Sequence, residues 1–157
     1  VWQGSPTFLR DQVRSIPLTN YAPLADVPGV RLISLQKGVG EEQLTALKGA
    51  FPVTTLSDDI DKEAGAFMDT AAILTQLDLL IVSDSSTALL SGALVCPICV
   101  LLGIVPDWRW LLDRSDSPWY PSVRLFRLSK GQSWPELFKE IAGALRNHVR
   151  TTSASRS

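Results

Sequence analysis

The sequence predicts an α/β protein built on a doubly wound, Rossmann-like parallel sheet. Strand-like and helix-like stretches alternate along the chain, and the strand-like stretches are almost wholly apolar. Strands that are buried on both faces of a parallel sheet typically consist of such continuous apolar residues. With 157 residues, 45% of them apolar, the chain can bury one ordinary core. We therefore expect one globular domain over residues 1–150.

The elements of this sheet can be placed in order. The predicted strands are Val1–Trp2, Val30–Gln36, Val53–Leu56, Leu79–Ser83, Ile98–Leu102 and Val123–Leu128. The predicted helices are Asn20–Ala25, Glu41–Ala50, Thr70–Gln76, Thr87–Leu94 and Pro135–Val149. Polar residues such as Asp69 and Ser133 are expected to act as N-caps. The first strand opens at Val1 itself, so we expect a fragment of a longer chain. Residues 151–157 are small and polar, and we expect a disordered tail.

Charge and hydropathy exclude two classes of partner. A net charge of −1 and a pI near 5.8 provide no basic surface for nucleic acid. The 18 residues Ala88–Val105 carry no charge, which is the lower limit for a membrane span. Gly92 and Pro97 interrupt them, so we favour a buried helix followed by a buried strand. Two cysteines and no signal peptide favour the cytoplasm.

The two cysteines form a C-x-x-C motif, Cys96-Pro97-Ile98-Cys99. A redox site of this type opens a helix and contains a thiolate with a lowered pKa. Here the motif leads into an apolar strand, on which positions i and i+3 face opposite sides. We therefore expect two buried, unpaired thiols and no zinc site, because the chain has a single histidine.

Ligands of parallel sheets bind outside the carboxyl ends of the strands. The strongest candidate there is the turn from Ser83 to Thr87, where a predicted strand runs into a predicted helix. Backbone N–H groups, the helix dipole and the hydroxyls of Ser85, Ser86 and Thr87 can bind an anion. The alternative is that Asp84 or Ser85 only caps the helix.

Five other segments carry polar or aromatic groups at the same edge. Gly4-Ser5-Pro6-Thr7, followed by Arg10 and Arg14, is either a flexible diphosphate loop or a turn with surface arginines. The polar side chains of Gln36 and Lys37 can contact a nucleoside, or they lie in a solvated loop. Those of Asp69 and Thr70 can also contact a nucleoside, or they cap a helix. The aromatic residues of Pro106–Trp110 and Pro118–Pro121 can wall a ligand site or pack loops onto the core.

Taken in order, several short motifs resemble the C-terminal donor-binding domain of bacterial tetratricopeptide-repeat glycosyltransferases, relatives of the heptosyltransferases and the O-linked N-acetylglucosamine transferases. The resemblance covers roughly residues 1–145. It rests on Val1-Trp2-Gln3-Gly4-Ser5-Pro6, Arg14-Ser15-Ile16-Pro17-Leu18, Ser34-Leu35-Gln36-Lys37-Gly38, Asp69-Thr70-Ala71-Ala72, Ser83-Asp84-Ser85, Gly92-Ala93-Leu94, Pro106-Asp107-Trp108-Arg109-Trp110-Leu111-Leu112 and Ser117-Pro118-Trp119-Tyr120-Pro121.

The resemblance implies half of a GT-B fold that binds a UDP-, GDP- or ADP-linked sugar, without a metal or other cofactor. An acceptor domain and helical repeats would lie upstream, and the general base would come from there. Donor diphosphate would be held by Gly4, Ser5, Arg14, Asp84, Ser85, Ser86 and Thr87, and the nucleoside by Gln36, Lys37, Asp69 and Thr70.

The chain departs from this family at two positions. Family members often carry histidines where this chain has Phe8 and Leu89, and its one histidine, His148, falls late in a predicted surface helix. The departures favour an alternative, a catalytically silent GT-B-like scaffold or interaction module. The sequence leaves both functions open.

Overall fold

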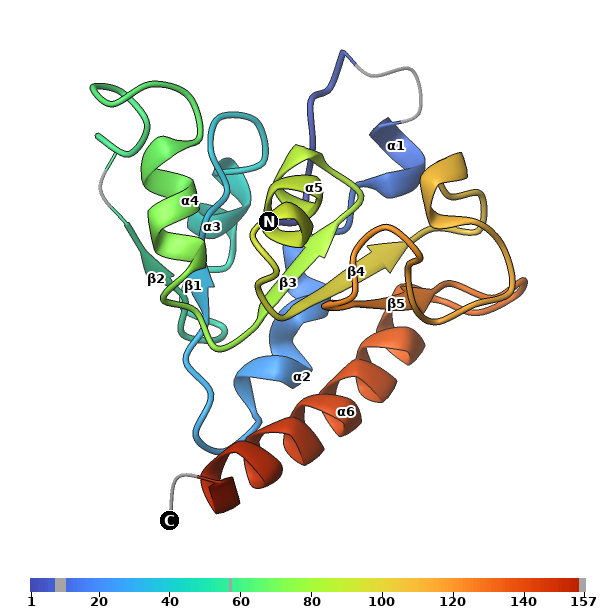
Figure 1. Cartoon of the computed structure of the whole chain (residues 1–157). Coiled ribbons are helices and arrows are strands. Elements are labelled where there is room, and N and C mark those ends of the chain that lie inside the picture. The colour runs from blue at the N-terminus through green and yellow to red at the C-terminus, as the bar shows by residue number, and fades with distance from the viewer. Residues whose placement is uncertain (8–10, 57, 156–157) are drawn as a thin grey trace.

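The computed structural model describes residues 1–7, 11–56 and 58–155 and shows an α/β protein with parallel strands (Figure 1). The strands are β1 (Ile33–Ser34), β2 (Thr54–Thr55), β3 (Leu80–Ser83), β4 (Ile98–Leu102) and β5 (Val123–Arg127). The helices are α1 (Asp11–Arg14), α2 (Ala22–Ala25), α3 (Glu42–Ala46), α4 (Met68–Leu74), α5 (Ser86–Ala93) and α6 (Trp134–Ser155), with 3₁₀ turns η1 (Leu18–Tyr21) and η2 (Trp108–Trp110).

The larger sheet has the order β3-β4-β5, and all its pairs are parallel. Its central strand β4 is buried along its whole length. Val100 and its neighbours two positions away pack into one apolar cluster, whereas Cys99 and Leu101 pack into another. This alternation is what a strand covered on both faces requires.

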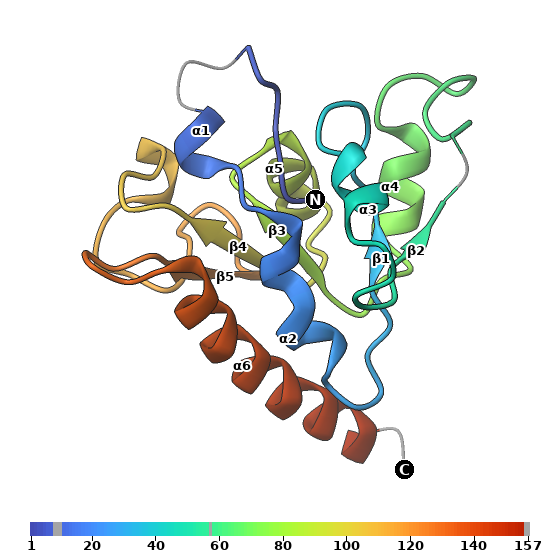
Figure 2. The same cartoon turned by 180° about the vertical axis from the view of Figure 1, so that it is seen from behind.

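Helices cover both faces of this sheet (Figures 1 and 2). Helix α5 contacts β3 and β4 on one face. On the other face α6 packs against β5, α2 and η1, with Phe138 fully buried. Helix α5 also packs closely against Tyr120 at Gly92, where a Cβ atom would lie 2.7 Å from the tyrosine ring.

The single sheet that we expected is divided in two. Strands β1 and β2 form a separate parallel pair. Residues Val1–Trp2, which we predicted as a strand, form no assigned strand in the structure. The carbonyl of Val1 accepts a hydrogen bond from the Ser83 amide (3.0 Å), but the Trp2 amide donates to the side chain of Gln36 (3.0 Å). A side chain thus takes the place of a ladder bond at this point.

The chain end also differs from our expectation. Residues 151–155 continue α6 in the structure, where we expected a separate polar tail. The hydroxyls of Thr151 and Thr152 both donate to the carbonyl of His148 (2.9 Å each) and are satisfied within the helix. Within the described ranges, no helix is both long and apolar enough to cross a membrane, and residues 88–105 divide between α5 and β4.

Replacing Phe138 with alanine tests the packing of α6 on the sheet. The ring is fully buried and lies 4.7 Å from the ring of Tyr21. Its loss should reduce the free energy of unfolding by about 3–5 kcal/mol. Urea denaturation measures this. Lys139→Ala, at the exposed neighbouring position, should change it by less than about 0.5 kcal/mol. If Phe138→Ala changed the free energy of unfolding as little as Lys139→Ala does, the packing of α6 on the sheet would be contradicted.

Candidate functional site

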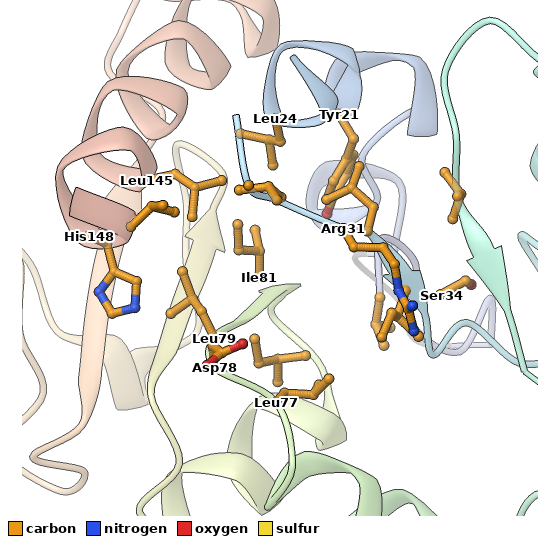
Figure 3. Close-up of a pocket in the computed structure, with 18 of the residues that line it drawn as sticks. Tyr21, Leu24, Arg31, Ser34, Leu77, Asp78, Leu79, Ile81, Leu145 and His148 are labelled. Atoms are coloured by element: carbon orange, nitrogen blue, oxygen red, sulfur yellow. The ribbon is translucent and has the colours of Figure 1, made fainter. Parts of the chain in front are cut away.

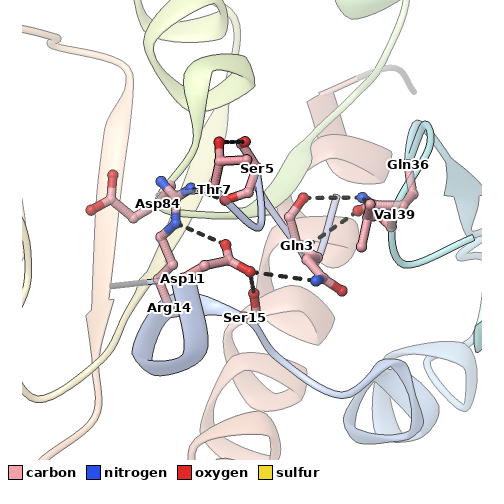
Figure 4. A network of polar contacts seen from close by, with 9 residues as sticks. All are labelled: Gln3, Ser5, Thr7, Asp11, Arg14, Ser15, Gln36, Val39 and Asp84. Atoms are coloured by element: carbon pink, nitrogen blue, oxygen red, sulfur yellow. Dashed lines mark hydrogen bonds and ion pairs between the residues drawn. The ribbon is translucent and has the colours of Figure 1, made fainter. Parts of the chain in front are cut away.

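Arg14 joins the first loop to the turn after β3 (Figure 4). Its Nη1 donates to the carbonyl of Asp84 (3.0 Å), its Nη2 to the carbonyl of Ser5 (3.3 Å), and its Nε to Asp11 Oδ1 (3.2 Å). A Cβ atom on Gly4 would lie 2.5 Å from Arg14 Nη2, so a larger residue at this position would displace the Arg14 guanidinium. The structure therefore brings together Gly4, Ser5, Arg14 and Asp84, which the sequence assigned to one site.

The turn between β3 and α5 holds two unused hydroxyl groups. The side-chain oxygens of Ser83 and Ser85 are buried and have no hydrogen-bond partner in the part of the chain that the structure describes. Ser85 is the N-cap of α5, yet its hydroxyl makes no capping bond. The first N–H groups of an α-helix also lack intrahelical partners. The turn thus offers donors that the fold does not consume, and Ser86 is exposed beside them.

Asp84 has a structural task within this turn. Its Oδ1 accepts a hydrogen bond from the indole nitrogen of Trp110 (2.8 Å), and the Trp110 side chain is fully buried. An ionised carboxylate offers only acceptors and cannot donate to a phosphate. Asp84 therefore positions Trp110 and, through its carbonyl, Arg14.

A cavity of about 750 Å³ lies beside the turn, lined by Arg14, Asp84 and the loop after β4. We expected the aromatic residues of this region either to form the wall of a ligand site or to pack loops onto the core, and the structure contains both kinds. Trp110 packs into the core, whereas Trp108 and Trp119 are 71% and 57% exposed. The guanidinium of Arg109 lies 5.6 Å from the Trp108 ring centre, a cation–π contact. Trp108 lines this cavity, so its exposed ring can contact a ligand there.

The side chain of Gln36, a predicted nucleoside ligand, is used inside the fold. Its Oε1 accepts from the amides of Trp2 (3.0 Å) and Gln3 (3.1 Å), and its Nε2 donates to the carbonyls of Gln3 (3.0 Å) and Val39 (2.7 Å). These four bonds use the full capacity of an amide. Gln36 fastens the N-terminal segment to the end of β1.

The other three predicted nucleoside residues meet around the segment Asp58–Asp61. Lys37 Nζ donates to the carbonyls of Asp58 (3.2 Å) and Ile60 (2.5 Å). Asp61 accepts from the amides of Asp69 (2.8 Å) and Thr70 (3.0 Å) and from the Thr70 hydroxyl (2.5 Å). The Asp69 carboxylate accepts in turn from the Asp61 amide (2.7 Å).

Asp61 therefore caps α4, a role that we had expected for Asp69. Helix α4 begins one residue earlier than Asp69, and its N-cap residue, Phe67, makes no side-chain capping bond. Partial burial acts to raise the pKa of Asp61, but hydrogen bonds from Thr70 and Asp69 hold that pKa below its usual value. Its backbone φ is +61°, a conformation that Asp and Asn tolerate best among residues with a Cβ.

The other described residues that the sequence analysis discussed do not contribute to the turn after β3. Leu89 packs beside the α5 face of the sheet, whereas Phe8 and Arg10 lie outside the described residues. His148 lines a different cavity, between β1 and β3. No group of three or more metal-ligating side chains occurs among the residues that the structure describes.

Both cysteines are buried and unpaired, as expected, and they pack into opposite apolar clusters. Burial raises the pKa of Cys99 to about 11, although the charge of Arg124 acts against the shift. A reactive thiolate needs the opposite shift. The geometry and the electrostatics both argue against the redox interpretation.

The fold and the turn after β3 define an α/β protein with parallel strands and a candidate anion site at their carboxyl edge. Over 132 residues, 83% of the chain, the sequence is 33% identical to Protein FlbA of Caulobacter vibrioides. The chain spans only about a fifth of that relative, 22% of its length. No family model matches the chain, and no solved structure matches it.

The Asp61 cap gives a pH-dependent prediction. A carboxylate whose pKa is lowered in the folded state stabilises it above the unfolded pKa of about 3.9, and the contribution is lost as the pH falls through the folded value. At pH 7, Asp61→Ala should therefore cost about 1–2 kcal/mol. Asp61→Asn, which tolerates the same backbone conformation, should cost less, and its deficit against the wild type should shrink toward pH 3.

Urea denaturation at pH 7 and pH 3 measures both variants. Asp59→Asn is the matched control, because its carboxylate is 82% exposed and forms an ion pair with the exposed Lys62. It should shift stability by less than about 1 kcal/mol at either pH. A deficit of Asp61→Asn that persists unchanged at pH 3 would refute the carboxylate's role.

Proposed function

We propose that this chain is the donor-binding half of a GT-B-type glycosyltransferase and that the turn after β3 binds the diphosphate of a nucleotide sugar. The pair of buried hydroxyls without partners, Ser83 and Ser85, carries the proposal. Burying a hydroxyl without a hydrogen bond costs free energy, so such groups call for a partner that the described residues do not supply. An anion at the start of α5 is a partner of the right charge.

The surroundings of the turn support the same ligand class. Gly4 and Arg14 bring a backbone loop and a guanidinium to the turn, as the resemblance to tetratricopeptide-repeat glycosyltransferases implies. In this scheme the N–H groups and hydroxyls at α5 stabilise the negative charge that develops on the leaving nucleotide. The neighbouring cavity, with its exposed Trp108, accommodates the rest of the donor. The acceptor and the general base belong to another part of the full protein.

Two observations favour a second candidate, a silent GT-B-like module that serves as a scaffold. The polar groups proposed for the nucleoside are occupied by internal bonds: Gln36 by the N-terminal segment, and Lys37, Asp69 and Thr70 by the Asp58–Asp61 segment. Leu89 replaces a histidine that is frequent in the family. On this alternative the turn binds no nucleotide.

Calorimetric titration with UDP, GDP and ADP distinguishes the two functions. The wild-type chain should bind one of them saturably, and Ser85→Asp should weaken that binding at least about tenfold, because it adds a negative charge beside the phosphate. Aspartate is also a good N-cap, so the substitution should leave α5 folded.

Ala154→Asp is the matched control, because it adds the same charge at an exposed position near the far end of α6. It should leave binding unchanged. If none of the three nucleotides binds at millimolar concentration, the donor site is refuted for this chain, and the scaffold function is favoured.

A further inference from the structure

A groove of about 460 Å³ separates the two sheets (Figure 3). Its walls are β1 with the residues before it, and β3 with Leu77–Leu79. Tyr21 of η1 and Leu24 of α2 line it, as do Leu145 and His148 of α6. Most of the lining side chains are apolar. Figure 1 shows β1 and β3 running beside each other without pairing.

The two strands turn open backbone edges toward this groove. Alternate residues of a strand present their N–H and C=O groups to opposite sides. The Thr54 amide bonds the carbonyl of Leu32 across the β1–β2 pair, and the Leu80 amide bonds the carbonyl of Pro97 across the β3–β4 pair. Ile33 and Ile81, one position further along, therefore direct their backbone groups into the groove. A strand laid between them could bond to both.

The N-terminal residues already begin such a strand. The carbonyl of Val1 accepts from the Ser83 amide, as a parallel neighbour of β3 would. Val1 packs beside one apolar cluster and Trp2 into the other, which is the alternation of a strand buried on both faces. Gln3 then reaches Gln36, beyond the carboxyl end of β1. A segment that led along the groove into Val1 would thus run parallel to both β1 and β3.

A buried hydroxyl also suits a backbone in the groove. The Tyr21 hydroxyl has no hydrogen-bond partner within the described part of the chain, and Tyr21 lines the groove. The matched region makes up 22% of the length of FlbA, so most of that relative lies outside it.

We propose that the groove is filled by an apolar β-strand of the same polypeptide that leads directly into Val1. This strand pairs in parallel with β1 on one side and β3 on the other. The two sheets then become one, with the order β2-β1-inserted strand-β3-β4-β5. The proposal concerns the sheet alone and does not rest on nucleotide binding.

Three versions of the chain, each extended by five residues before Val1, test this strand. At about 3.3 Å per residue, five residues can span the groove beside β3. The first extension is Thr-Val-Val-Ile-Val. The second, Gly-Ser-Gly-Ser-Gly, is flexible and polar. The third, Pro-Val-Pro-Val-Pro, is apolar but lacks alternate N–H donors.

Amide hydrogen exchange of Ile33 and Ile81, followed by NMR, is the measurement. The β-forming extension should slow exchange at both amides at least tenfold relative to the Gly-Ser extension. The proline-containing extension should not do so, because its rings take the place of the N–H groups that would face β1, so the segment cannot lie as a central strand between β1 and β3. Equal exchange in all three chains would overturn the proposal. Equal protection by the proline-containing extension would also overturn it, since a segment that cannot form a central strand would then protect the two amides as well.

Discussion

The attachment of the N-terminal segment to both sheets is the constraint on which the rest of the structure depends. Gln36 fixes this segment to β1 through three hydrogen bonds to Trp2 and Gln3, and Arg14 ties the loop that follows it to the turn after β3. Gln3 and Asp11 join the two attachments, since Gln3 Nε2 donates to Asp11 Oδ2 (3.4 Å). Most bonds of this network are partly buried, so the loss of one member leaves its partners without a hydrogen bond. The network therefore fixes the carboxyl edge, where the candidate site lies, as a single unit.

Much of the fold could be predicted from the sequence because its strongest signals are local. Strand β4 was predicted with its observed bounds, since its five apolar residues follow a proline and precede a glycine. The uncharged residues 88–105 divide into the helix α5 and the strand β4, and Pro97 lies between the two. Signals that depend on distant partners were missed. No local pattern shows that a side chain, Gln36, replaces a ladder bond at Trp2. The expected single sheet is divided at this point.

The candidate site was predictable to a similar extent. Loops at the carboxyl ends of parallel strands must converge, and Gly4, Arg14 and Asp84 do so. The sequence could not show which of the converging polar groups remain available, because that depends on competition from internal partners. Asp61 occupies the first turn of α4 from eight residues upstream of Asp69, and nothing in its surroundings signals a cap. Conversely, the unused hydroxyls at Ser83 and Ser85 are visible only once their neighbours are placed.

Electrostatics narrow what the turn after β3 can bind by itself. Arg14, the cation at the turn, is already paired with Asp11 at 3.2 Å, and both side chains are largely buried. A partly buried ion pair gives little net attraction to a third charge, because each partner screens the other. The attraction for a phosphate must therefore come from neutral donors, namely the hydroxyls and the N-terminal N–H groups of α5. Donors of this kind orient an anion well, but they neutralise little of the charge of a diphosphate. This chain alone should therefore bind a donor only weakly, and a cation from another domain, at a site that closes between the two, would strengthen the binding.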